Sequence, residues 1–223
     1  MVSSTATRRF RSAFALTCVL ATAVCAATEA RAQTNSGAQT NVGAQSSVPT
    51  VPAGLSARLA VCAACHGGDG NAVVPGSPSL SAQPRLFLEN QMVLIRDGLR
   101  EIAPMTGMLD GFKDQELSEI AKYYSGLPAK PEPIRLNQAK AQRGAASSSK
   151  GLCGTCHLPD YRGREQMPRL SAQREDFLLA SMRQFRTGQT KGRDTMMSSV
   201  LFGLSDDELS DLAHYFATRP WQP

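Results

Sequence analysis

Apolar residues recur with helical spacing in four stretches of the chain, which form two matching pairs. One pair covers residues 84–98 and 174–188, and the other covers residues 114–125 and 206–218. In the first stretch, Leu86, Met92, Leu94 and Ile95 stand at helical spacing. Residues 205–208 (Ser-Asp-Asp-Glu) form a capping box at the start of the last stretch. Glycine and proline fill the segments between the stretches. The pattern therefore predicts an all-α fold.

The two halves of the chain are repeats of each other. Pro-Ser-Leu-Ser-Ala-Gln at residues 78–83 is matched by Pro-Arg-Leu-Ser-Ala-Gln at residues 168–173, and both closing stretches open on Asp-x-Glu-Leu-Ser. The offset between equivalent positions stays between 90 and 92 residues. Chance similarity would not keep this register, so we predict two homologous helical domains.

Composition sets the boundaries of these domains. We expect the first domain at residues 53–127 and the second at residues 137–223, joined by a stiff linker at residues 128–136 that contains three prolines. Residues 33–52 are rich in Gln, Thr, Asn, Ser and Gly and show no helical period, which predicts a disordered leader. Residues 1–32 are typical of a secretory signal peptide.

The predicted signal peptide has an arginine-rich start, a short apolar centre and a small-x-small site that favours cleavage near Ala32. Its removal would discard Cys18 and Cys25. The alternative is that it stays as an N-terminal membrane anchor. No later stretch approaches 18 apolar residues, so we expect a soluble mature protein.

The charge of the chain gives no reason to expect a nucleic-acid partner. The full sequence has 24 basic and 19 acidic side chains, a net charge of +5. Without residues 1–32, which hold four of the arginines and one glutamate, 20 basic and 18 acidic side chains remain. A long basic run or an aromatic ladder, as a nucleic-acid groove requires, is missing from the sequence.

Each half carries one Cys-x-x-Cys-His motif, at residues 62–66 and 153–157, which we expect to follow a short helix. This spacing is the attachment signal for haem c. Two thiols on one helical turn can form thioethers to the two vinyl groups of one porphyrin, and the histidine then lies beneath the iron. Cys62, Cys65, Cys153 and Cys156 are therefore predicted to bind two covalent haem groups. Two disulfides, or a zinc or thiol site, are the alternatives.

His66 and His157 are the predicted proximal ligands. The remaining histidine outside the motifs, His214, takes the place of Lys122 in the first half, so we expect it at the surface or between the halves. One spare histidine cannot give both irons a second imidazole. A methionine sulfur, which is soft, neutral and raises the reduction potential, is the expected sixth ligand.

Each half offers two methionines for this position. Met105 lies seven residues before Phe112, and Met197 lies seven residues before Leu204, at the start of the closing segment in each half. We therefore predict Met105 and Met197 as ligands. Met108, which aligns with a valine, and Met196 are the alternatives and are otherwise expected to pack.

These motifs resemble the class I cytochromes c, and their tandem arrangement is similar to the cytochrome c4 family over roughly residues 53–223. The resemblance implies two class I domains with His/Met ligation, related by a pseudo-two-fold axis. It also implies that the carbonyl oxygens of Pro78 and Pro168 accept hydrogen bonds from the proximal histidines. The second motif departs from the pattern, because Leu-Pro-Asp-Tyr follows His157 where a glycine-rich run follows His66.

An iron closed on both sides by protein ligands exchanges electrons and does not readily bind a substrate. We therefore expect a periplasmic dihaem electron carrier that is not an enzyme. Its expected partners are redox proteins: a quinol-oxidising complex or dehydrogenase upstream and a terminal oxidase or reductase downstream, with peripheral membrane contact left open. The alternatives are a dihaem subunit of a dehydrogenase and a haem enzyme such as a dihaem peroxidase.

Overall fold

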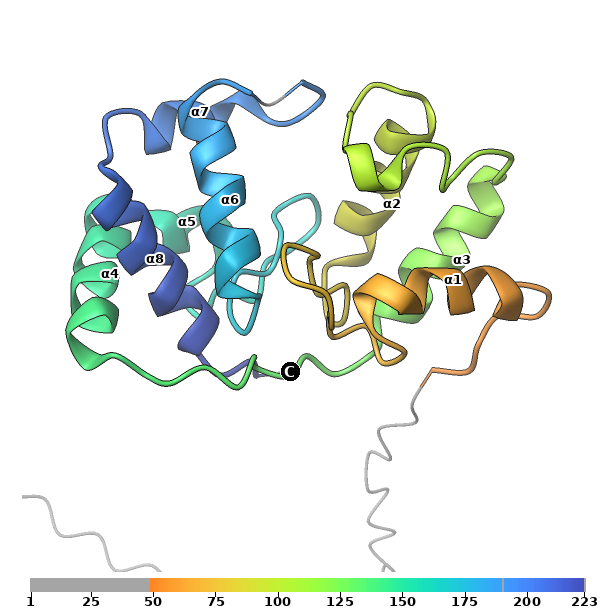
Figure 1. Ribbon diagram of the computed structural model, residues 1–223, viewed down its shortest axis with the longest axis horizontal. Helices are drawn as coiled ribbons and strands as arrows, with labels where there is room; N and C mark the ends of the chain where they lie inside the picture. The colour runs from red at the N-terminus through yellow and green to blue at the C-terminus, as the bar shows by residue number, and fades with distance from the viewer. Residues whose placement is uncertain (1–48, 190, 223) are drawn as a thin grey trace, which may run out of the picture. The chain divides into compact units, whose positions relative to one another are not determined.

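The computed structural model describes residues 49–189 and 191–222 (Figure 1). The predicted signal peptide and residues 33–48 of the predicted leader lie outside the described residues. The described part of the chain is helical, as expected, and contains no β-strand beyond an isolated bridge between Arg164 and Met167. No helix in this part is long and apolar enough to cross a membrane.

The described helices fall into two sets that follow the sequence repeat. The helices of the first half are α1 (Ser56–His66), α2 (Arg85–Arg96), the 3-10 turn η1 (Ala103–Met105) and α3 (Asp114–Ser125). The helices of the second half are α4 (Gln138–Lys150), α5 (Cys153–His157), α6 (Glu175–Arg186), α7 (Thr195–Leu201) and α8 (Asp206–Thr218). The segment between α3 and α4 has no helix, and this is where the linker is predicted.

The core of the first half forms where α2 packs against α3. Its buried side chains are Leu55, Leu59, Leu88, Ile120, Ala121, Tyr124 and Leu127. One apolar residue of α2 lies outside its buried face. Leu86 is 48% exposed, whereas Leu88 is buried. Leu88 lies one helical turn before Met92, which also packs against this core, so the two side chains share one face of α2.

In the second half, α8 packs against both α4 and α6. Gly144 permits the close crossing of α4 and α8, because a Cβ atom there would lie 2.2 Å from the carbonyl oxygen of Asp211. Arg143 forms an ion pair with the carboxylate of the same Asp211 at 2.6 Å. The helix before the second cysteine motif is longer than the short helix expected from the sequence. The observed α4 has 13 residues, rich in alanine and serine.

His214 does not take the position that the sequence analysis predicted. The side chain is buried in the second half. Its Nδ1 atom lies 2.9 Å from the carboxylate of Glu175, and its Nε2 atom accepts the backbone N–H of Asn137 at 2.9 Å. His214 therefore joins α8 to the starts of α4 and α6, and it lies neither at the surface nor between the halves.

The segment between α3 and α4 is bound to both halves. The Lys130 ammonium pairs with Asp69 at 2.6 Å in the first half. Glu132 pairs with Arg174 at 3.0 Å in the second half and also accepts the backbone N–H of Glu175. These contacts hold the connecting segment along both halves without a helix.

Candidate haem-binding sites

The two cysteine motifs lie at equivalent places in the fold. Cys62 and Cys65 are on the last turn of α1, and Cys153 and Cys156 are on the single turn of α5. The first cysteine of each pair is half-buried against its own core, while the second is exposed. Burial raises the pKa of Cys62 and of Cys153. All four thiols are free, so the alternative of two disulfides is not realised.

The histidine of each motif is buried and held by one hydrogen bond. The Nδ1 atom of His66 lies 2.8 Å from the carbonyl oxygen of Pro78, and the Nδ1 atom of His157 lies 2.8 Å from that of Pro168. Burial lowers the pKa of both imidazoles, and the bond to the proline carbonyl opposes this shift. A neutral imidazole that donates from Nδ1 keeps the lone pair of Nε2 available for a metal.

The Nε2 atom of His157 tests whether a haem iron fits at this histidine. This atom of His157 is buried and has no hydrogen-bond partner in the structure. A buried polar atom without a partner costs about 1–3 kcal/mol. Iron bound at this nitrogen would remove that cost, so the residues present fit a haem ligated by His157.

The predicted sulfur ligands lie in the segments between the second and last helices of each half. Met105 ends η1 and is half-buried, whereas Met108 is 42% exposed. Met197 is in α7 and packs against the core of the second half, whereas Met196 is 64% exposed. In each half, the methionine predicted as the ligand is thus the less exposed of the two.

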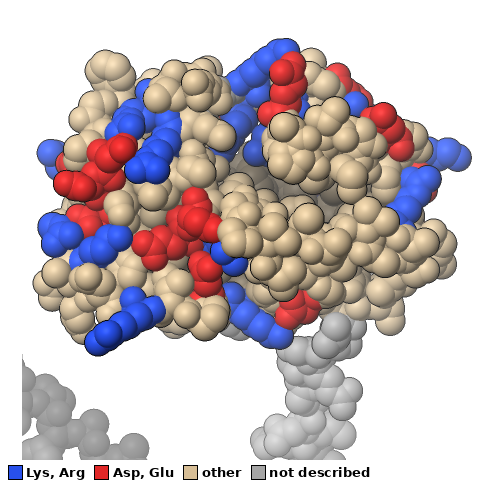
Figure 2. All heavy atoms as spheres, in the orientation of Figure 1, with Lys and Arg blue, Asp and Glu red and all other residues tan. Residues whose placement is uncertain are grey.

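Uncovered apolar surface surrounds the cysteine motifs. Val61 and Leu152 immediately precede the first cysteine of each motif and are 55% and 70% exposed. Figure 2 shows a hollow in the first half, between α1 and the segment that carries η1, with uncharged surface on both sides. A porphyrin in such a hollow would cover apolar surface and add the bulk that a small helical domain lacks.

A zinc site of protein ligands does not explain the motifs. No group of three or more His, Cys, Asp or Glu side chains within residues 49–189 and 191–222 is arranged to hold a metal ion. A structural zinc site requires four such ligands. The motifs are consistent with haem attachment, where the porphyrin itself supplies four nitrogens.

Sequence reasoning missed one pair of residues next to these sites. The structure shows that Gln173 of the second half binds Ser79, the residue after Pro78. Gln83 of the first half binds Arg169, the residue after Pro168. The repeat of the Ser-Ala-Gln segment was visible in the sequence, but its partner across the two halves was not.

The fold and the paired sites define a dihaem c-type cytochrome, and known proteins identify its family. No protein-family model matches the sequence. Cytochrome c4 of Azotobacter vinelandii is 32% identical over 176 residues, which cover 71% of this chain and 84% of the relative. Cytochrome c4 of Pseudomonas aeruginosa is 33% identical over 168 residues, with the same coverage. The chain belongs to the cytochrome c4 family.

Solved structures agree with this assignment. The crystal structure of reduced recombinant cytochrome c4 from Pseudomonas stutzeri matches with a TM-score of 0.68 at 31% identity, over 74% of this chain and 96% of that one. A thiosulfate dehydrogenase electron acceptor of Thiomonas intermedia is a further relative, 29% identical over 79% of this chain and 87% of that protein. The protein is therefore a dihaem electron carrier with two covalently bound haem c groups, and its partners are redox proteins.

Proposed function

We propose that the first haem is bound by Cys62 and Cys65 and ligated by His66 and Met105. The second haem is bound and ligated by the equivalent residues, which are Cys153, Cys156, His157 and Met197. The observation that carries this proposal is the repeated proximal arrangement, in which Nδ1 is engaged by a proline carbonyl and the buried Nε2 of His157 has no partner.

This ligand set would make the protein a carrier and not an enzyme. A haem held by histidine and methionine would supply one-electron exchange, because these two residues would leave no open position for a substrate. The chain's own contribution is to hold the imidazole in one orientation, to present a half-buried sulfur, and to keep water away from the porphyrin face.

The sulfur ligands are tested by four alanine variants of the haem-loaded protein. Met105→Ala and Met197→Ala should each abolish the Fe(III)–sulfur charge-transfer band of one haem and lower the reduction potential of that haem. Met108→Ala and Met196→Ala are the matched controls, and both should keep the two sulfur bands. Loss of a band in a control, or its survival in Met105→Ala or Met197→Ala, would overturn the assignment for that half.

We further propose that the mature protein works in the periplasm, after cleavage near Ala32. The support is the arginine-rich, apolar and small-residue pattern of residues 1–32. Mass spectrometry of the protein from a periplasmic extract would show a mature chain that begins at Gln33 and carries two haem groups. An intact N-terminus in the membrane fraction would instead favour the retained anchor.

The partner that the comparisons favour as a second candidate is a thiosulfate dehydrogenase. Besides the Thiomonas intermedia relative, the structure of thiosulfate dehydrogenase TsdBA from Marichromatium purpuratum matches with a TM-score of 0.59 at 26% identity, over 71% of this chain and 36% of that one. Stopped-flow reduction of the oxidised protein separates the candidates. Fast reduction by such a dehydrogenase with thiosulfate supports this partner, whereas fast reduction only by a quinol-oxidising complex supports a respiratory role.

A further inference from the structure

The two halves meet through a symmetric pair of amide contacts. Gln173 of the second half binds the backbone of Ser79: its Oε1 atom accepts the Ser79 N–H at 2.8 Å, and its Nε2 atom donates to the Ser79 carbonyl at 2.9 Å. Gln83 of the first half binds Arg169 in the same way, at 2.9 and 3.1 Å. All four residues are at most 4% exposed, so water does not compete for these bonds.

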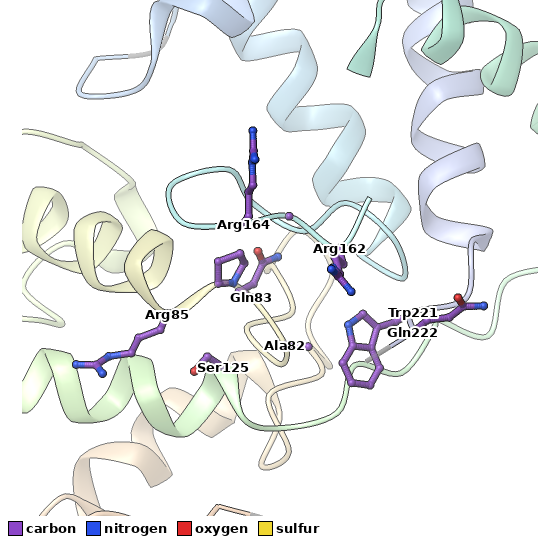
Figure 3. Close-up of a pocket in the computed structure, with 10 residues that line it drawn as sticks. Ala82, Gln83, Arg85, Ser125, Arg162, Arg164, Trp221 and Gln222 are labelled. Atoms are coloured by element: carbon purple, nitrogen blue, oxygen red, sulfur yellow. The ribbon is translucent and has the colours of Figure 1, made fainter. Parts of the chain in front are cut away.

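Each contact is directly linked to a proximal histidine. The N–H of Ser79 and the carbonyl of Pro78 belong to one peptide group. His66 donates to the oxygen of this group at 2.8 Å, and the nitrogen of the same group donates to Gln173 at 2.8 Å. The peptide group between Pro168 and Arg169 connects His157 to Gln83 in the same way. Figure 3 shows Gln83 beneath the second-half loop that carries Arg164.

Hydrogen bonds in such a chain polarise one another. A peptide group that donates its N–H to an amide oxygen has more negative charge on its carbonyl oxygen. That oxygen is then a stronger acceptor for the imidazole Nδ1–H, which makes the imidazole a stronger electron donor to iron. A stronger donor favours Fe(III), so the reduction potential of that haem falls.

We propose that Gln173 tunes the haem of the first half and that Gln83 tunes the haem of the second half. Each glutamine is a positioning residue, because it acts on the iron through a peptide group and a histidine of the opposite half. The proposal rests on the ligation by His66 and His157 proposed above. It makes the docking of the halves part of what sets each potential.

An interface bond that lies away from the histidines provides a matched control. The side-chain amide of Asn90 donates to Gln166 across the same junction at 3.0 Å, at the protein surface. Its loss would weaken the contact between the halves without changing a histidine-bonded peptide group. Gln166→Met therefore separates the tuning of a haem from a general loosening of the interface.

The experiment uses the haem-loaded protein and its Gln173→Met, Gln83→Met and Gln166→Met variants. A redox titration followed by NMR gives the potential of each haem, once the haem methyl signals are assigned to a half through contacts with its side chains. Gln173→Met should raise the potential of the first-half haem more than that of the second, and Gln83→Met should do the reverse. Gln166→Met should change neither potential.

A second readout follows the hydrogen bond itself. In the reduced, diamagnetic protein, Gln173→Met should move the Nδ1–H signal of His66 upfield and leave that of His157 in place. If this variant fails to fold, Gln173→Asn is the replacement, because its amide is one methylene too short to reach Ser79. An equal shift at both haems, a shift confined to the variant's own half, or no shift would overturn the inference.

Failure of this inference is distinguishable from failure of the proposed ligation. His66→Ala should remove the proximal nitrogen from the first-half haem, as its spin state would show. If that haem keeps its ligand in His66→Ala, the ligation itself is wrong. If the ligand is lost but the glutamine variants lack the crosswise pattern, only the tuning is wrong.

Discussion

The loops that follow the two cysteine motifs have the same backbone path but different residues. In the first half, Gly67 and Gly70 have φ values of +78° and +75°. In the second half, Leu158 and Tyr161 occupy the equivalent positions, with φ values of +70° and +58°. Positive φ is natural for glycine and strained for other residues. The second half therefore adopts this conformation with backbone strain, whereas the first half adopts it without strain.

The reason for keeping this path is the segment that it supports. The carbonyl oxygen of Gly70 accepts the N–H groups of residues 80 and 81, and the carbonyl oxygen of Tyr161 accepts those of residues 170 and 171. These bonds hold the segments that contain Pro78 and Pro168, the acceptors for the two buried histidines. The position of the proximal histidine thus depends on the loop in both halves.

Packing compensates the strain in the second half. Tyr161 is buried, its hydroxyl lies 3.0 Å from that of Ser148, and its ring contacts Phe216 edge-on with centroids 4.9 Å apart. In the first half the corresponding space is filled differently, since a Cβ atom at Gly70 would lie 3.0 Å from the ring of Tyr124. One geometry is therefore reached by a permissive residue in one half and by a buried aromatic side chain in the other.

Of the changes that test this comparison, truncation of the Tyr161 side chain should have the largest effect on stability. Tyr161→Ala removes a buried ring and should lower the free energy of unfolding by about 3–5 kcal/mol. Denaturant unfolding of the haem-loaded protein measures this. Tyr161→Phe is the control: it keeps the ring and loses only the hydroxyl bond, which is worth about 1 kcal/mol. A loss below about 1 kcal/mol in Tyr161→Ala would show that packing does not hold the loop.

A side chain in the first-half loop should be the next most harmful change. In Gly67→Ala the new Cβ atom would lie 2.1 Å from the carbonyl oxygen of Asn71, at a residue with φ of +78°. Strain and overpacking together should cost about 2–3 kcal/mol. Gly54→Ala is the matched control, because Gly54 has φ of +79° but no neighbour within 4 Å of the new atom. Equal costs in the two variants would mean that the close contact contributes nothing.

The reverse change in the second half should stabilise the protein. Leu158 has φ of 70° and ψ of 157°, a region that is essentially restricted to glycine. Leu158→Gly should relieve about 1–3 kcal/mol of backbone strain in the folded state. It should also stabilise the unfolded chain by about 0.4–1 kcal/mol, because glycine makes that chain more flexible. We expect a net gain of about 1 kcal/mol, measured by denaturant unfolding. A net loss would show that contacts of the Leu158 side chain outweigh the strain.

Helices with strong local signals were predictable from the sequence. α3 and α8 begin and end at the predicted residues, because both have a regular apolar period and α8 also has the capping box at Ser205 and Glu208. α2 and α6 lie within the predicted ranges but end earlier, since Gly98 and Gly188 adopt positive φ just beyond them. α7 and η1 were not predicted, because such short helical segments have weak local signals of their own.

The local chemistry of the site was predictable, and its long-range contacts were not. The resemblance to the cytochrome c4 family implied that Pro78 and Pro168 accept from the proximal histidines, and the structure confirms both contacts, each between residues within 12 positions of each other. Gln173 and Ser79 are 94 positions apart, and a sequence repeat does not say which surfaces of the two copies meet. His214 was misplaced for the same reason, as its partners Asn137 and Glu175 are distant in the chain.

The smallest expected effect concerns the start of α8, where two arginines bind one carboxylate. Asp206 accepts hydrogen bonds from Arg186 at 2.6 Å and from Arg183 at 3.1 Å. The equivalent residue in the first half, Asp114, accepts from one arginine, Arg96. Arg96 also binds its neighbour in the chain, Asp97. The bond from Arg186, followed by the one from Arg183, lowers the pKa of Asp206.

A carboxylate with a lowered folded-state pKa stabilises the fold above its unfolded pKa of about 3.9, and this contribution is lost as the pH falls through the folded value. The stability difference between the wild type and Asp206→Asn should therefore be present at neutral pH and disappear in acid. Because the pair is exposed, the difference should also shrink with added salt. Asp207→Asn removes a charge from the same helical turn and serves as the control. If both variants lose the same stability at neutral pH, the effect comes from the helix dipole and not from the arginine pair.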